Sequence, residues 1–380
     1  MTPTLIITND FPPTVGGIET FVAEVCRLLD DDVIVLTRHT PGWQEFDRRA
    51  GFPVIRSGRL LLPTTAVGRR AAELVGRHKI NSVVFGAMAP LALLAPTLRA
   101  AGARSLLAIS HGHECWWATL PGSRRLLRRM ADEVDHVSYI SDYTRRRIGP
   151  VLSPGAQQRM VRISPPVDAV RFGPPGALQP AVRHGRPRRV LAVGRMVRQK
   201  GFDTLLRAWR LLRARSGPDD HAELVLVGDG PQGPALRQLA VRLQIATTVR
   251  FTGRQDRDAV AALLRTADVF ALPVRTRLGG LYPEGFGLAF AEAAASGVPV
   301  VVGRSGGAPE TVIDGETGYV VDAGDPEQLA DRIGQLLTHP GTAAAMGRAG
   351  RDFVRTRYGT ETARDTIRSA LALSDGGDIG

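Results

Sequence analysis

The sequence predicts an α/β protein that consists of two doubly wound, Rossmann-like domains. Three observations support this prediction. Strand-like and helix-like stretches alternate along the chain, a proline-rich stretch interrupts the alternation near the middle, and 380 residues exceed what a single hydrophobic core usually organises. Alternating β and α units form parallel sheets covered by helices on both faces. We expect the domains to face each other across a cleft, with ligands bound at the carboxyl ends of the strands.

The first half of the chain begins with a short apolar strand and an amphipathic helix. Apolar residues recur at helical spacing between Gly17 and Leu29, which is typical of a helix packed on a sheet. Further helices are expected at 89–101 and 123–133. The strands of this half are expected at Thr4–Thr8, Val33–Leu36, Val54–Ile55, Ser82–Phe85, Ser105–Ile109, Val137–Ile140 and Val161–Ile163.

A stretch from residue 173 to 189 is rich in proline and lacks periodicity, so we assign it as a domain linker. The first domain is expected to cover residues 1–172 and the second 190–359, and a last helix at about 360–380 is expected to cross back onto the first domain. The second half should contain strands at Val190–Val193, Glu223–Val227, Val249–Thr252, Val269–Leu272 and Val298–Val302, with helices at 202–214, 234–243, 257–266, from Leu288, and 326–337.

The charge of the chain is basic, with 49 basic and 37 acidic residues and a formal net charge of +12. Such a balance suits nucleic acid or an anionic membrane as a partner. Aromatic residues make up only 6% and do not interleave with the arginines, and no known nucleic-acid-binding signature is present, so we expect no nucleic acid. All but two basic residues are arginines. The exceptions are Lys79 and Lys200, and a compact ammonium group can serve a phosphate site.

The chain carries no sign of a membrane span or a disulfide framework. No apolar run reaches the length of a membrane helix, and the N-terminus lacks a signal-peptide pattern. Cys26 and Cys115 are the only cysteines, which fits a reducing compartment. We therefore expect a cytoplasmic protein.

The most informative stretch pairs two glutamates, Glu284 and Glu292, eight positions apart. Gly285 and Gly287 follow the first glutamate, and small residues lead into a helix. A glycine-rich entry lets backbone N–H groups approach a phosphate at the helix N-terminus. Eight positions return to nearly the same helix face, so both carboxylates can look into one cleft. A glutamate beside a phosphate site is better suited to sugar hydroxyls, so the stretch predicts an elongated ligand with phosphate and sugar parts.

Two other strand-to-helix turns carry candidate anion-binding groups. Gly16 and Gly17 open the first helix with bare backbone amides, which suit a phosphate or a sugar ring; a tight turn with positive φ explains the glycines equally well. In the second domain, Arg195 can bind phosphate oxygens with two N–H groups, and Lys200 adds a point charge. The alternative, two solvated side chains, is weakened because both follow the first strand of their domain.

Residues 228–233 match the G-x-G-x-x-G dinucleotide fingerprint between a strand and a helix. The match follows the second strand of its domain, whereas the fingerprint belongs on the first. A capped βα turn is therefore the better explanation.

The segment Ser110-His111-Gly112-His113-Glu114 follows an expected strand. Two histidines and a glutamate suggest a metal site, but the spacing differs from His-Glu-x-x-His on a helix, and we expect no metal. We favour His111 as a cleft residue that hydrogen-bonds a sugar hydroxyl, and His113 as a structural loop residue. An acidic run at 30–32 closes the first helix and is expected to be a solvated turn.

These residues resemble the family-4 retaining glycosyltransferases, which have the GT-B architecture, over essentially the whole chain. The most specific elements are the Glu284–Glu292 pair in its Glu-Gly-Phe-Gly context, Gly194-Arg195 with Lys200-Gly201, and Gly16-Gly17. A finer resemblance is to the mannosyltransferases that act on phosphatidylinositol monomannoside. It rests on residues 8–13, 85–96, 111–114, 275–277 and 305–312.

The resemblance implies a role for each candidate residue. Arg195 and Lys200 would hold the donor diphosphate, Glu292 the nucleotide ribose and Glu284 the donor sugar. The implied catalytic residues are His111 near the reacting carbon, Asp10 by the acceptor hydroxyl, and Glu284. The implied donor-binding residues are Gly16, Gly17, Arg195, Lys200, Gly228, Gln255, Asp256, Glu284, Gly285, Phe286, Gly287, Leu288 and Glu292.

The mechanism of that family is a front-face reaction, in which the leaving phosphate helps to deprotonate the acceptor and configuration is retained. The chain offers strong diphosphate stabilisation and no obvious nucleophile, which suits this mechanism. The expected activity is that of a retaining hexosyltransferase that uses a nucleotide-diphosphate sugar. No cofactor or divalent metal is expected, because Arg195 and Lys200 neutralise the diphosphate.

The donor and the acceptor are narrower expectations. Asp256 follows Gln255 at the end of a strand, and a carboxylate there could accept from N1 and N2 of guanine, which uracil lacks. This favours GDP-mannose as donor and a lipid-linked glycan, such as a phosphatidylinositol mannoside, as acceptor.

Basic clusters suggest docking on the anionic inner face of the plasma membrane, at ~1 kcal/mol per basic residue. Ordinary solvated helix faces explain each cluster equally well. One cluster contains Arg69, Arg70, Arg77 and Lys79, and the other contains Arg124, Arg125, Arg128 and Arg129.

Three other functions are compatible with parts of the sequence. One is a glycosyltransferase with a soluble, secondary-metabolite acceptor and a different nucleotide sugar. Another is a GT-B nucleotide-sugar epimerase, although the pair of glutamates favours transfer. A third is a non-catalytic nucleotide-sugar-binding protein, which the joint presence of Asp10, His111 and the donor-site residues argues against.

Overall fold

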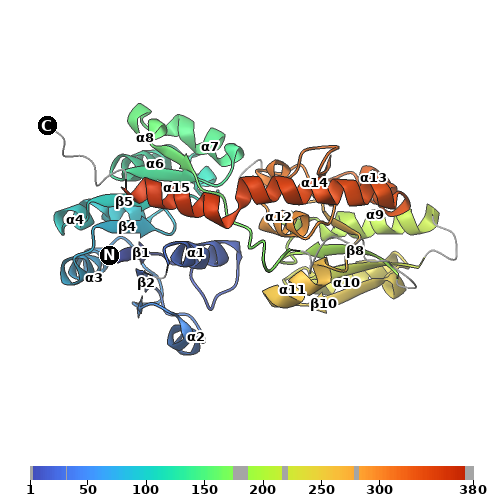
Figure 1. Cartoon of the computed structure of the whole chain (residues 1–380), viewed down its shortest axis with the longest axis horizontal. Helices are drawn as coiled ribbons and strands as arrows, with labels where there is room; N and C mark the ends of the chain where they lie inside the picture. The colour runs from blue at the N-terminus through green and yellow to red at the C-terminus, as the bar shows by residue number, and fades with distance from the viewer. Residues whose placement is uncertain (1–2, 31, 174–186, 216–220, 278–281, 373–380) are drawn as a thin grey trace. The chain divides into compact units, whose positions relative to one another are not determined.

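A computed structural model of the chain describes residues 3–30, 32–173, 187–215, 221–277 and 282–372 (Figure 1). The chain folds into two compact units. Unit 1 contains residues 1–166 and 360–380, and unit 2 contains residues 167–359. Each unit is built on one parallel sheet, as the alternation of strands and helices predicts.

Unit 1 has a seven-stranded sheet in the order β3-β2-β1-β4-β5-β6-β7, with parallel pairs throughout. Ile7 lies opposite Leu36 on one side and Phe85 on the other, so the loops after β1 and β4 leave the same edge. This doubly wound order confirms the predicted fold class. The strands are β1 (Thr4–Ile7), β2 (Val33–Thr37), β3 (Val54–Arg56), β4 (Ser82–Phe85), β5 (Ser105–Ala108), β6 (His136–Tyr139) and β7 (Met160–Arg162).

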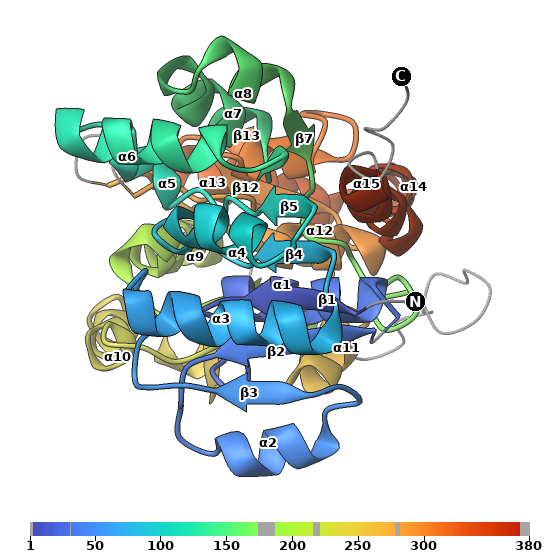
Figure 2. The ribbon, with the colours of Figure 1, turned by 90° about the vertical axis from the view of Figure 1, so that its left-hand side faces the viewer.

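Helices cover both faces of this sheet. Figure 2 shows α3, α4 and α6 side by side in front of the strands, while α1 packs with α15 on the other face. The helices are α1 (Gly17–Leu28), α2 (Trp43–Arg49), α3 (Thr65–His78), α4 (Ala95–Ala100), α5 (Glu114–Trp117), α6 (Pro121–Asp132), α7 (Asp142–Ile148), α8 (Pro154–Gln158) and α15 (Thr360–Ala372), with 3-10 turns η1 (Leu91–Leu94) and η2 (Gly149–Val151).

Unit 2 has a six-stranded parallel sheet in the order β10-β9-β8-β11-β12-β13. Its strands are β8 (Arg188–Val193), β9 (Ala222–Val227), β10 (Val249–Gly253), β11 (Val269–Leu272), β12 (Val300–Gly303) and β13 (Gly318–Val321). Its helices are α9 (Phe202–Arg215), α10 (Gly233–Arg242), α11 (Arg257–Leu264), α12 (Leu288–Ala295), α13 (Pro326–Thr338) and α14 (Pro340–Tyr358), with 3-10 turns η3 (Arg198–Lys200), η4 (Ala246–Thr248) and η6 (Ala308–Thr311).

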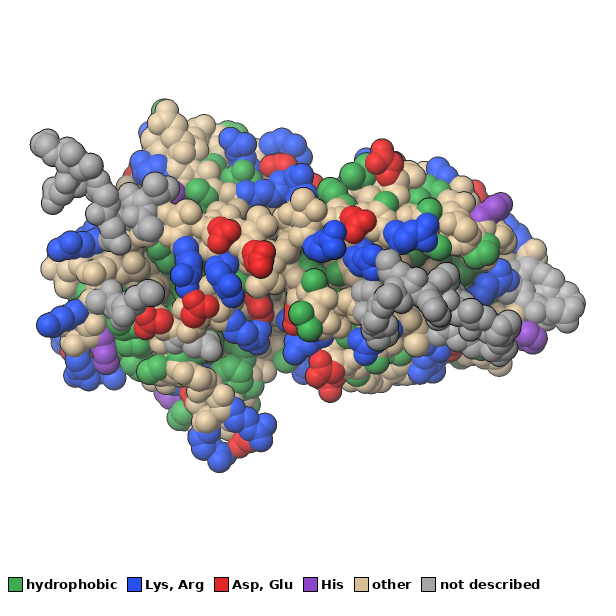
Figure 3. Space-filling model, in the orientation of Figure 1, with side chains coloured by type: hydrophobic (Ala, Val, Ile, Leu, Met, Phe, Trp, Pro, Cys, Tyr) green, Lys and Arg blue, Asp and Glu red, His purple; other side chains and the backbone are tan. Residues whose placement is uncertain are grey.

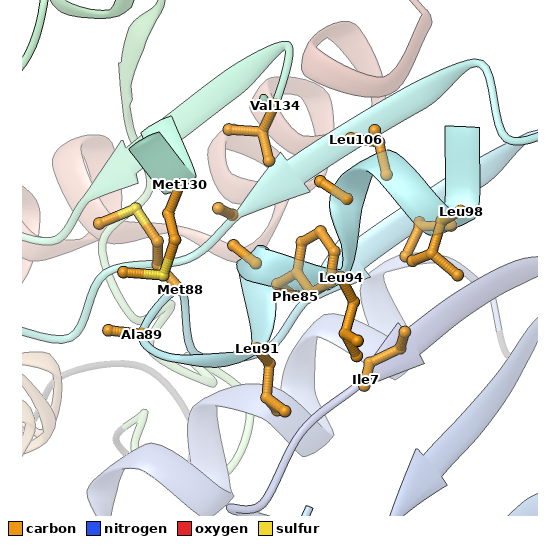
Figure 4. Close-up of a cluster of buried hydrophobic side chains, with 14 of the residues drawn as sticks. Ile7, Phe85, Met88, Ala89, Leu91, Leu94, Leu98, Leu106, Met130 and Val134 are labelled. Carbon is orange, nitrogen blue, oxygen red and sulfur yellow. The ribbon is translucent and has the colours of Figure 1, made fainter. Parts of the chain in front are cut away.

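The core of unit 1 lies between the sheet and the layer formed by α3, α4 and α6. Figure 4 shows Phe85 and Leu106 from neighbouring strands close to Leu94 and Leu98, and Met130 reaches the cluster from α6. Full burial of a large apolar side chain contributes about 1.5–3 kcal/mol. This packing fixes the strands whose carboxyl ends carry the candidate site of unit 1.

Helix α15, the last helix of the described residues, belongs to unit 1. Helix α15 packs against α1, β5 and β7. Asp30 follows α1 with a positive φ of 56° and forms ion pairs with Arg364 and Arg368 of α15. Asp30 lies in an exposed turn, as the sequence predicts, and its ion pairs also link this turn to the C-terminal helix.

The boundary between the units falls after Pro166, whereas the sequence suggests a first domain that ends at residue 172. The Val167 N–H donates to the Tyr358 carbonyl (2.9 Å), and Arg171 Nε lies 2.9 Å from a carboxylate oxygen of Asp258. Residues 167–172 therefore fold with unit 2. Of the expected linker at 173–189, residues 174–186 lie outside the described residues.

Most expected elements are confirmed to within a few residues, and the exceptions have local causes. The helix expected at 89–101 is the 3-10 turn η1 followed by α4, with Pro96 in the first turn of α4. The sequence does not predict β13, which begins at a glycine and has only three apolar residues. Helix α14 is also missed, because glycines and arginines obscure its apolar spacing.

No helix within the described ranges is long and apolar enough to cross a bilayer. Cys26 and Cys115 are both buried, and neither forms a disulfide within the described residues.

The contact between α14 and the turn after α12 gives a test of the packing of unit 2. A Cβ added at Gly347 would overlap the Gly297 carbonyl oxygen, so Gly347→Ala forces the backbone to shift. We expect a loss of about 2–3 kcal/mol and a melting temperature that is lower by several degrees. Gly341→Ala is the matched control, because nothing lies within 4 Å of a Cβ at that position. The melting temperatures are measured by circular dichroism. Equal values for the two variants would contradict this account.

Candidate active site

The loop that carries Glu284 is fixed by close packing against the loop after β12. Gly306 has a positive φ of 56°, and a Cβ there would overlap the Glu284 carbonyl oxygen. The Gly307 N–H donates to that carbonyl (2.8 Å), and the Glu284 N–H donates to Ser305 Oγ (3.3 Å). The backbone of Glu284 is therefore held on both sides, which restricts where its carboxylate can point.

Lys200 and Glu284 form an ion pair in unit 2. Lys200 Nζ lies 2.7 Å from Glu284 Oε2, and the side chains are 24% and 19% exposed. Lys200 ends η3 and is followed by Gly201, whose φ is 69° and where a Cβ would overlap the Pro273 carbonyl. The structure thus brings together the predicted phosphate-binding lysine and the predicted sugar-binding carboxylate.

Arg195 lies on the same loop after β8. It is exposed and forms no ion pair with any residue of the described ranges. Its guanidinium is therefore available to an anionic ligand, and its planar N–H groups suit two phosphate oxygens.

The N-terminus of α12 offers backbone donors. The N–H groups of Phe286, Gly287 and Leu288 donate to no acceptor in the part of the chain that is described. Gly287 has a φ of 92°, and a Cβ there would overlap the Phe290 ring. Unsatisfied N–H groups at the start of a helix attract anions.

The helical-periodicity argument for the two glutamates is wrong in one respect. Helix α12 begins at Leu288, so Glu292 lies just over one turn inside it, and Glu284 precedes it in a loop. The eight-residue interval therefore does not place both carboxylates on one helix face. Glu284 is placed by its loop, and Glu292 by the helix.

Glu292 is 9% exposed and is paired with Arg257, whose Nη2 donates to Glu292 Oε1 (2.9 Å). Burial raises the pKa of Glu292 to about 7, while Arg257 acts in the opposite direction. The Arg257 guanidinium also lies over the Phe172 ring, 5.3 Å from its centroid. Glu292 is thus a buried carboxyl group that titrates close to neutral pH.

Arg257 is a candidate functional residue that the sequence reasoning missed. A basic residue in the first turn of α11 is unfavourable for the helix dipole, and this local conflict was an available signal. The structure supplies the reason, because Arg257 turns to Glu292 on another helix.

The residues expected near the donor base lie at the carboxyl ends of β9 and β10. Asp256 is the N-cap of α11, and its Oδ1 accepts from the Ala259 N–H (2.8 Å). Gln255 donates to the Thr252 carbonyl (3.0 Å). Gly228 has a φ of 130°, and a Cβ there would overlap the Gly194 carbonyl oxygen. Close packing therefore accounts for Gly228, in agreement with a turn and not a dinucleotide fingerprint.

In unit 1, His111 follows β5 and is almost fully buried (8% exposed). Its Nε2 donates to the Gly86 carbonyl, and its ring meets the Phe21 ring edge-on at 5.6 Å between centroids. A carbonyl can only accept, so the proton resides on Nε2 and Nδ1 keeps a lone pair. Burial lowers the pKa of His111, so the neutral ring is the form present at neutral pH. The Nδ1 atom can therefore accept from a ligand hydroxyl.

Asp10 and Glu19 are carboxylates of the first βα turn. Burial raises the pKa of Glu19, and the negative charge of Asp10 adds to the effect. The negative charge of Asp10 also acts to raise the pKa of His111, against the larger effect of burial. Asp10 therefore lies close enough to both Glu19 and His111 to influence their pKa values. The sequence reasoning missed Glu19, although it lies two positions after Gly17.

The turn at Gly16 and Gly17 does not need a positive φ. Gly16 is extended with a φ of −172°, and Gly17 is the first residue of α1. The alternative explanation of these glycines as a strained turn is therefore wrong. A Cβ at Gly16 would instead overlap the Glu19 carboxylate, and nothing lies within 4 Å of a Cβ at Gly17.

The histidine segment does not assemble into a metal site. The described residues contain no group of three or more His, Cys, Asp or Glu side chains that could hold a metal ion. The His113 ring stacks on His111 with centroids 6.2 Å apart, and its Nε2 lies 3.3 Å from Glu114 Oε1.

Comparisons with solved structures support the fold. HepE from Anabaena in complex with UDP superposes with a TM-score of 0.80 at 19% identity, covering 98% of this chain and 100% of that one. Sucrose-phosphate synthase from Thermosynechococcus elongatus gives a TM-score of 0.77 at 21% identity, covering 100% of both chains. These neighbours have the GT-B fold.

Comparisons with sequences identify relatives over the full length. The proteins named GDP-mannose-dependent alpha-(1-6)-phosphatidylinositol monomannoside mannosyltransferase from Mycobacterium tuberculosis H37Rv and Mycolicibacterium smegmatis are 42% and 44% identical to this chain. The first alignment covers 99% of both chains, and the second covers 92% of this chain and 93% of the relative. A Corynebacterium glutamicum protein, named GDP-mannose-dependent monoacylated alpha-(1-6)-phosphatidylinositol monomannoside mannosyltransferase, is 39% identical over 97% of both chains.

The two halves of the chain also match family descriptions. Residues 15–171 match Glycosyltransferase Family 4, and residues 179–353 match Glycosyl transferases group 1. With full-length relatives at about 40% identity and two parallel-sheet units of the GT-B type, the chain belongs to the family-4 glycosyltransferases and is a hexosyltransferase.

Proposed function

We propose that this protein transfers mannose from GDP-mannose to a phosphatidylinositol mannoside, with retention of configuration and without a divalent metal. The observation that carries the proposal is the arrangement in unit 2 of Lys200, Glu284 and the N–H groups of residues 286–288, which have no acceptor within the described ranges. It combines donors for a diphosphate with a carboxylate for sugar hydroxyls. The names of the full-length relatives supply the donor and the acceptor class.

In this proposal, the donor binds to unit 2 through its diphosphate, its ribose and its mannose. Arg195, Lys200 and the backbone N–H groups of residues 286–288 hold the diphosphate. When Lys200 turns to the phosphates, Glu284 becomes free to accept from hydroxyls of the mannose. Glu292 accepts from the ribose hydroxyls.

The acceptor side of the reaction is assigned to unit 1. His111, with the lone pair on Nδ1, accepts from a hydroxyl of the mannose near the reacting carbon, and Asp10 lies by the acceptor hydroxyl. The leaving phosphate takes the acceptor proton, and the new bond forms on the face that the phosphate leaves. Arg195 and Lys200 stabilise the charge that develops on the phosphate, which is the task that a divalent cation performs elsewhere.

The direct test combines a donor screen with an acceptor trial. The protein with GDP-mannose and phosphatidylinositol monomannoside is expected to form a dimannoside with an α linkage, detected by mass spectrometry and NMR, and EDTA is expected to have no effect. Glu284→Gln should lower kcat/KM by about 10–100-fold, because a charged acceptor for sugar hydroxyls is lost. Transfer only to a soluble acceptor would favour a secondary-metabolite enzyme, and free epimerised sugar would favour an epimerase. A β linkage or loss of activity in EDTA would overturn the corresponding part of the proposal.

The preference for guanine is tested by Asp256→Asn. Asparagine still caps α11, because its carbonyl oxygen replaces Oδ1, but its NH2 group opposes the N–H donors of guanine. The preference for GDP-mannose over UDP-glucose, measured as the ratio of kcat/KM values, is expected to fall by about tenfold or more. Asp256→Ala would confuse this effect with loss of the helix cap. An unchanged ratio in a correctly folded Asp256→Asn protein would remove Asp256 from base recognition.

The pH dependence tests the role of Glu292. Ribose hydroxyls donate to the ionised form, and the pKa of Glu292 is about 7. The kcat/KM for GDP-mannose is therefore expected to rise from about pH 6 to about pH 8 and then to level off. Arg257→Ala removes a cation that lowers this pKa, so the midpoint should shift to higher pH. Arg254→Ala removes an exposed cation nearby and is the control. A midpoint that stays fixed in Arg257→Ala, or moves to lower pH, would contradict the assignment.

Membrane docking is a further part of the proposal. Two basic clusters lie on α3 and α6, helices of the same layer of unit 1 (Figure 2). Arg70 pairs with Glu73, whereas Arg124, Arg125, Arg128 and Arg129 form no ion pair within the described part of the chain. On the face drawn in Figure 3, basic side chains occur on both units with acidic ones among them. The four arginines of α6, which lack an ion pair within the described residues, favour this helix, together with Arg69, Arg77 and Lys79 from the α3 end of the same layer, as the surface that meets anionic lipid.

Vesicle co-sedimentation tests this surface. Replacement of Arg69, Arg77, Arg124 and Arg128 by glutamine should reduce binding to vesicles with anionic lipid by at least 100-fold, at ~1 kcal/mol for each residue. Binding to neutral vesicles should not change.

The matched control removes the same charge from exposed positions of unit 2. Arg207, Arg210, Arg242 and Arg348 are replaced by glutamine together, and this variant should bind anionic vesicles like the unmodified protein. Equal losses in both variants would show an effect of net charge alone and would contradict docking through α3 and α6.

A further inference from the structure

Glu114, the first residue of α5, is a fully buried acidic side chain next to the His111 loop. Its exposed fraction is 0%, which is rare for glutamate unless the carboxylate has strong partners. None of the roles described above uses it. Its burial therefore requires an explanation.

The partners of Glu114 come from the three residues at the start of the same loop. Its Oε2 accepts from Ser110 Oγ (3.1 Å), from the His111 N–H (3.0 Å) and from the Gly112 N–H (3.1 Å). Gly112 has a φ of 95°, so the loop turns sharply around the carboxylate. One oxygen atom thus satisfies two backbone donors and one side-chain donor.

The second carboxylate oxygen does not explain the burial. Oε1 has no hydrogen-bond partner within the described residues, although it lies 3.3 Å from His113 Nε2. The hydrogen bonds of this side chain therefore all go to Ser110, His111 and Gly112. A longer bond links the loop to the sheet at Ser110, from the Ser110 N–H to Ser138 Oγ (3.3 Å).

The position of the His111 ring depends on this backbone. The ring contacts the Gly86 carbonyl and the Phe21 ring, and the His111 backbone N–H donates to Glu114 Oε2. If the loop relaxed, the hydrogen bond to Gly86 and the direction of Nδ1 would both change. A displacement of about 1 Å at a reacting centre can cost about 100-fold in rate.

We propose that Glu114 is a positioning residue for the transfer reaction, whose carboxylate holds the loop that aims His111 Nδ1 at a sugar hydroxyl. This proposal rests on the proposed function of His111. It concerns unit 1 only, so Glu114 should affect turnover and leave binding of the nucleotide part of the donor to unit 2 unchanged.

The experiment is a double-mutant cycle with Glu114→Ala, His111→Ala and the combination, assayed with GDP-mannose and phosphatidylinositol monomannoside. Glu114→Ala is expected to lower kcat by about 10–100-fold with less than a twofold change in GDP affinity. The double variant should be no more than about threefold slower than His111→Ala, because the two residues act through one ring.

Two further variants separate positioning from stability. Glu114→Gln keeps an oxygen for the three donors and loses the charge, so a smaller decrease of about 3–10-fold is expected, and it remains informative if Glu114→Ala does not fold. Asp135→Asn is the control, because Asp135 accepts from the Leu106 N–H (2.7 Å) at the opposite end of β5. It should lower the melting temperature without changing kcat of the folded protein.

The outcomes distinguish the proposed role of His111 from the positioning role of Glu114. If His111→Ala has normal kcat, the role of His111 fails. If His111→Ala is slow but Glu114→Ala and Glu114→Gln are as fast as Asp135→Asn, the positioning role of Glu114 fails. Multiplicative losses in the double variant would also overturn it, because independent effects do not arise from one ring.

Discussion

The candidate site of unit 2 depends on backbone packing that leaves no room for a Cβ atom. Three glycines with positive φ, Gly201, Gly228 and Gly306, each lie against a backbone carbonyl of another loop. A Cβ at these positions would overlap the carbonyls of Pro273, Gly194 and Glu284, respectively. These contacts join the loops that follow neighbouring strands. Arg195, Lys200 and Glu284 therefore extend from backbones that support one another, and a change at any of the three glycines would displace groups that it does not touch.

Unit 1 fixes its candidate residues by a different means, through side chains that bind backbone. Asn9 donates to the Leu61 carbonyl (2.9 Å) and accepts from the Leu61 N–H (2.8 Å), which anchors the loop before Asp10. Arg56, whose side chain is 2% exposed, donates to the Pro12 carbonyl (2.7 Å). Glu114 has the same function for the loop of His111. Polar side chains can be exchanged one at a time, so this unit can alter its loops with less disturbance of the sheet.

The sequence predicts the fold and the candidate residues better than it predicts their surroundings. Alternating strands and helices define both sheets, because each βα unit is local. The sequence also shows the glycine-rich entry to α12 and the carboxylates of Glu284 and Glu292, because these features lie close together in the chain. The partners Lys200 and Arg257 are 84 and 35 positions away from them, and no periodicity connects such distances. Gly228 shows the opposite case, where a local pattern resembles a fingerprint but is explained by a non-local contact with Gly194.

The ion pairs of unit 2 have a consequence for how a ligand can bind. Lys200 and Arg257 each pair with one of the two glutamates, and Lys200 is the cation that a diphosphate would draw away. A diphosphate that attracts Lys200 would leave Glu284 without a counter-charge unless sugar hydroxyls arrived at the same time. Binding at this site is therefore an exchange of partners, in which each part of the ligand compensates for what another part disrupts. Fragments of the ligand, such as a free sugar or inorganic diphosphate, would lack that compensation, and the whole molecule would bind more tightly than its separate parts suggest.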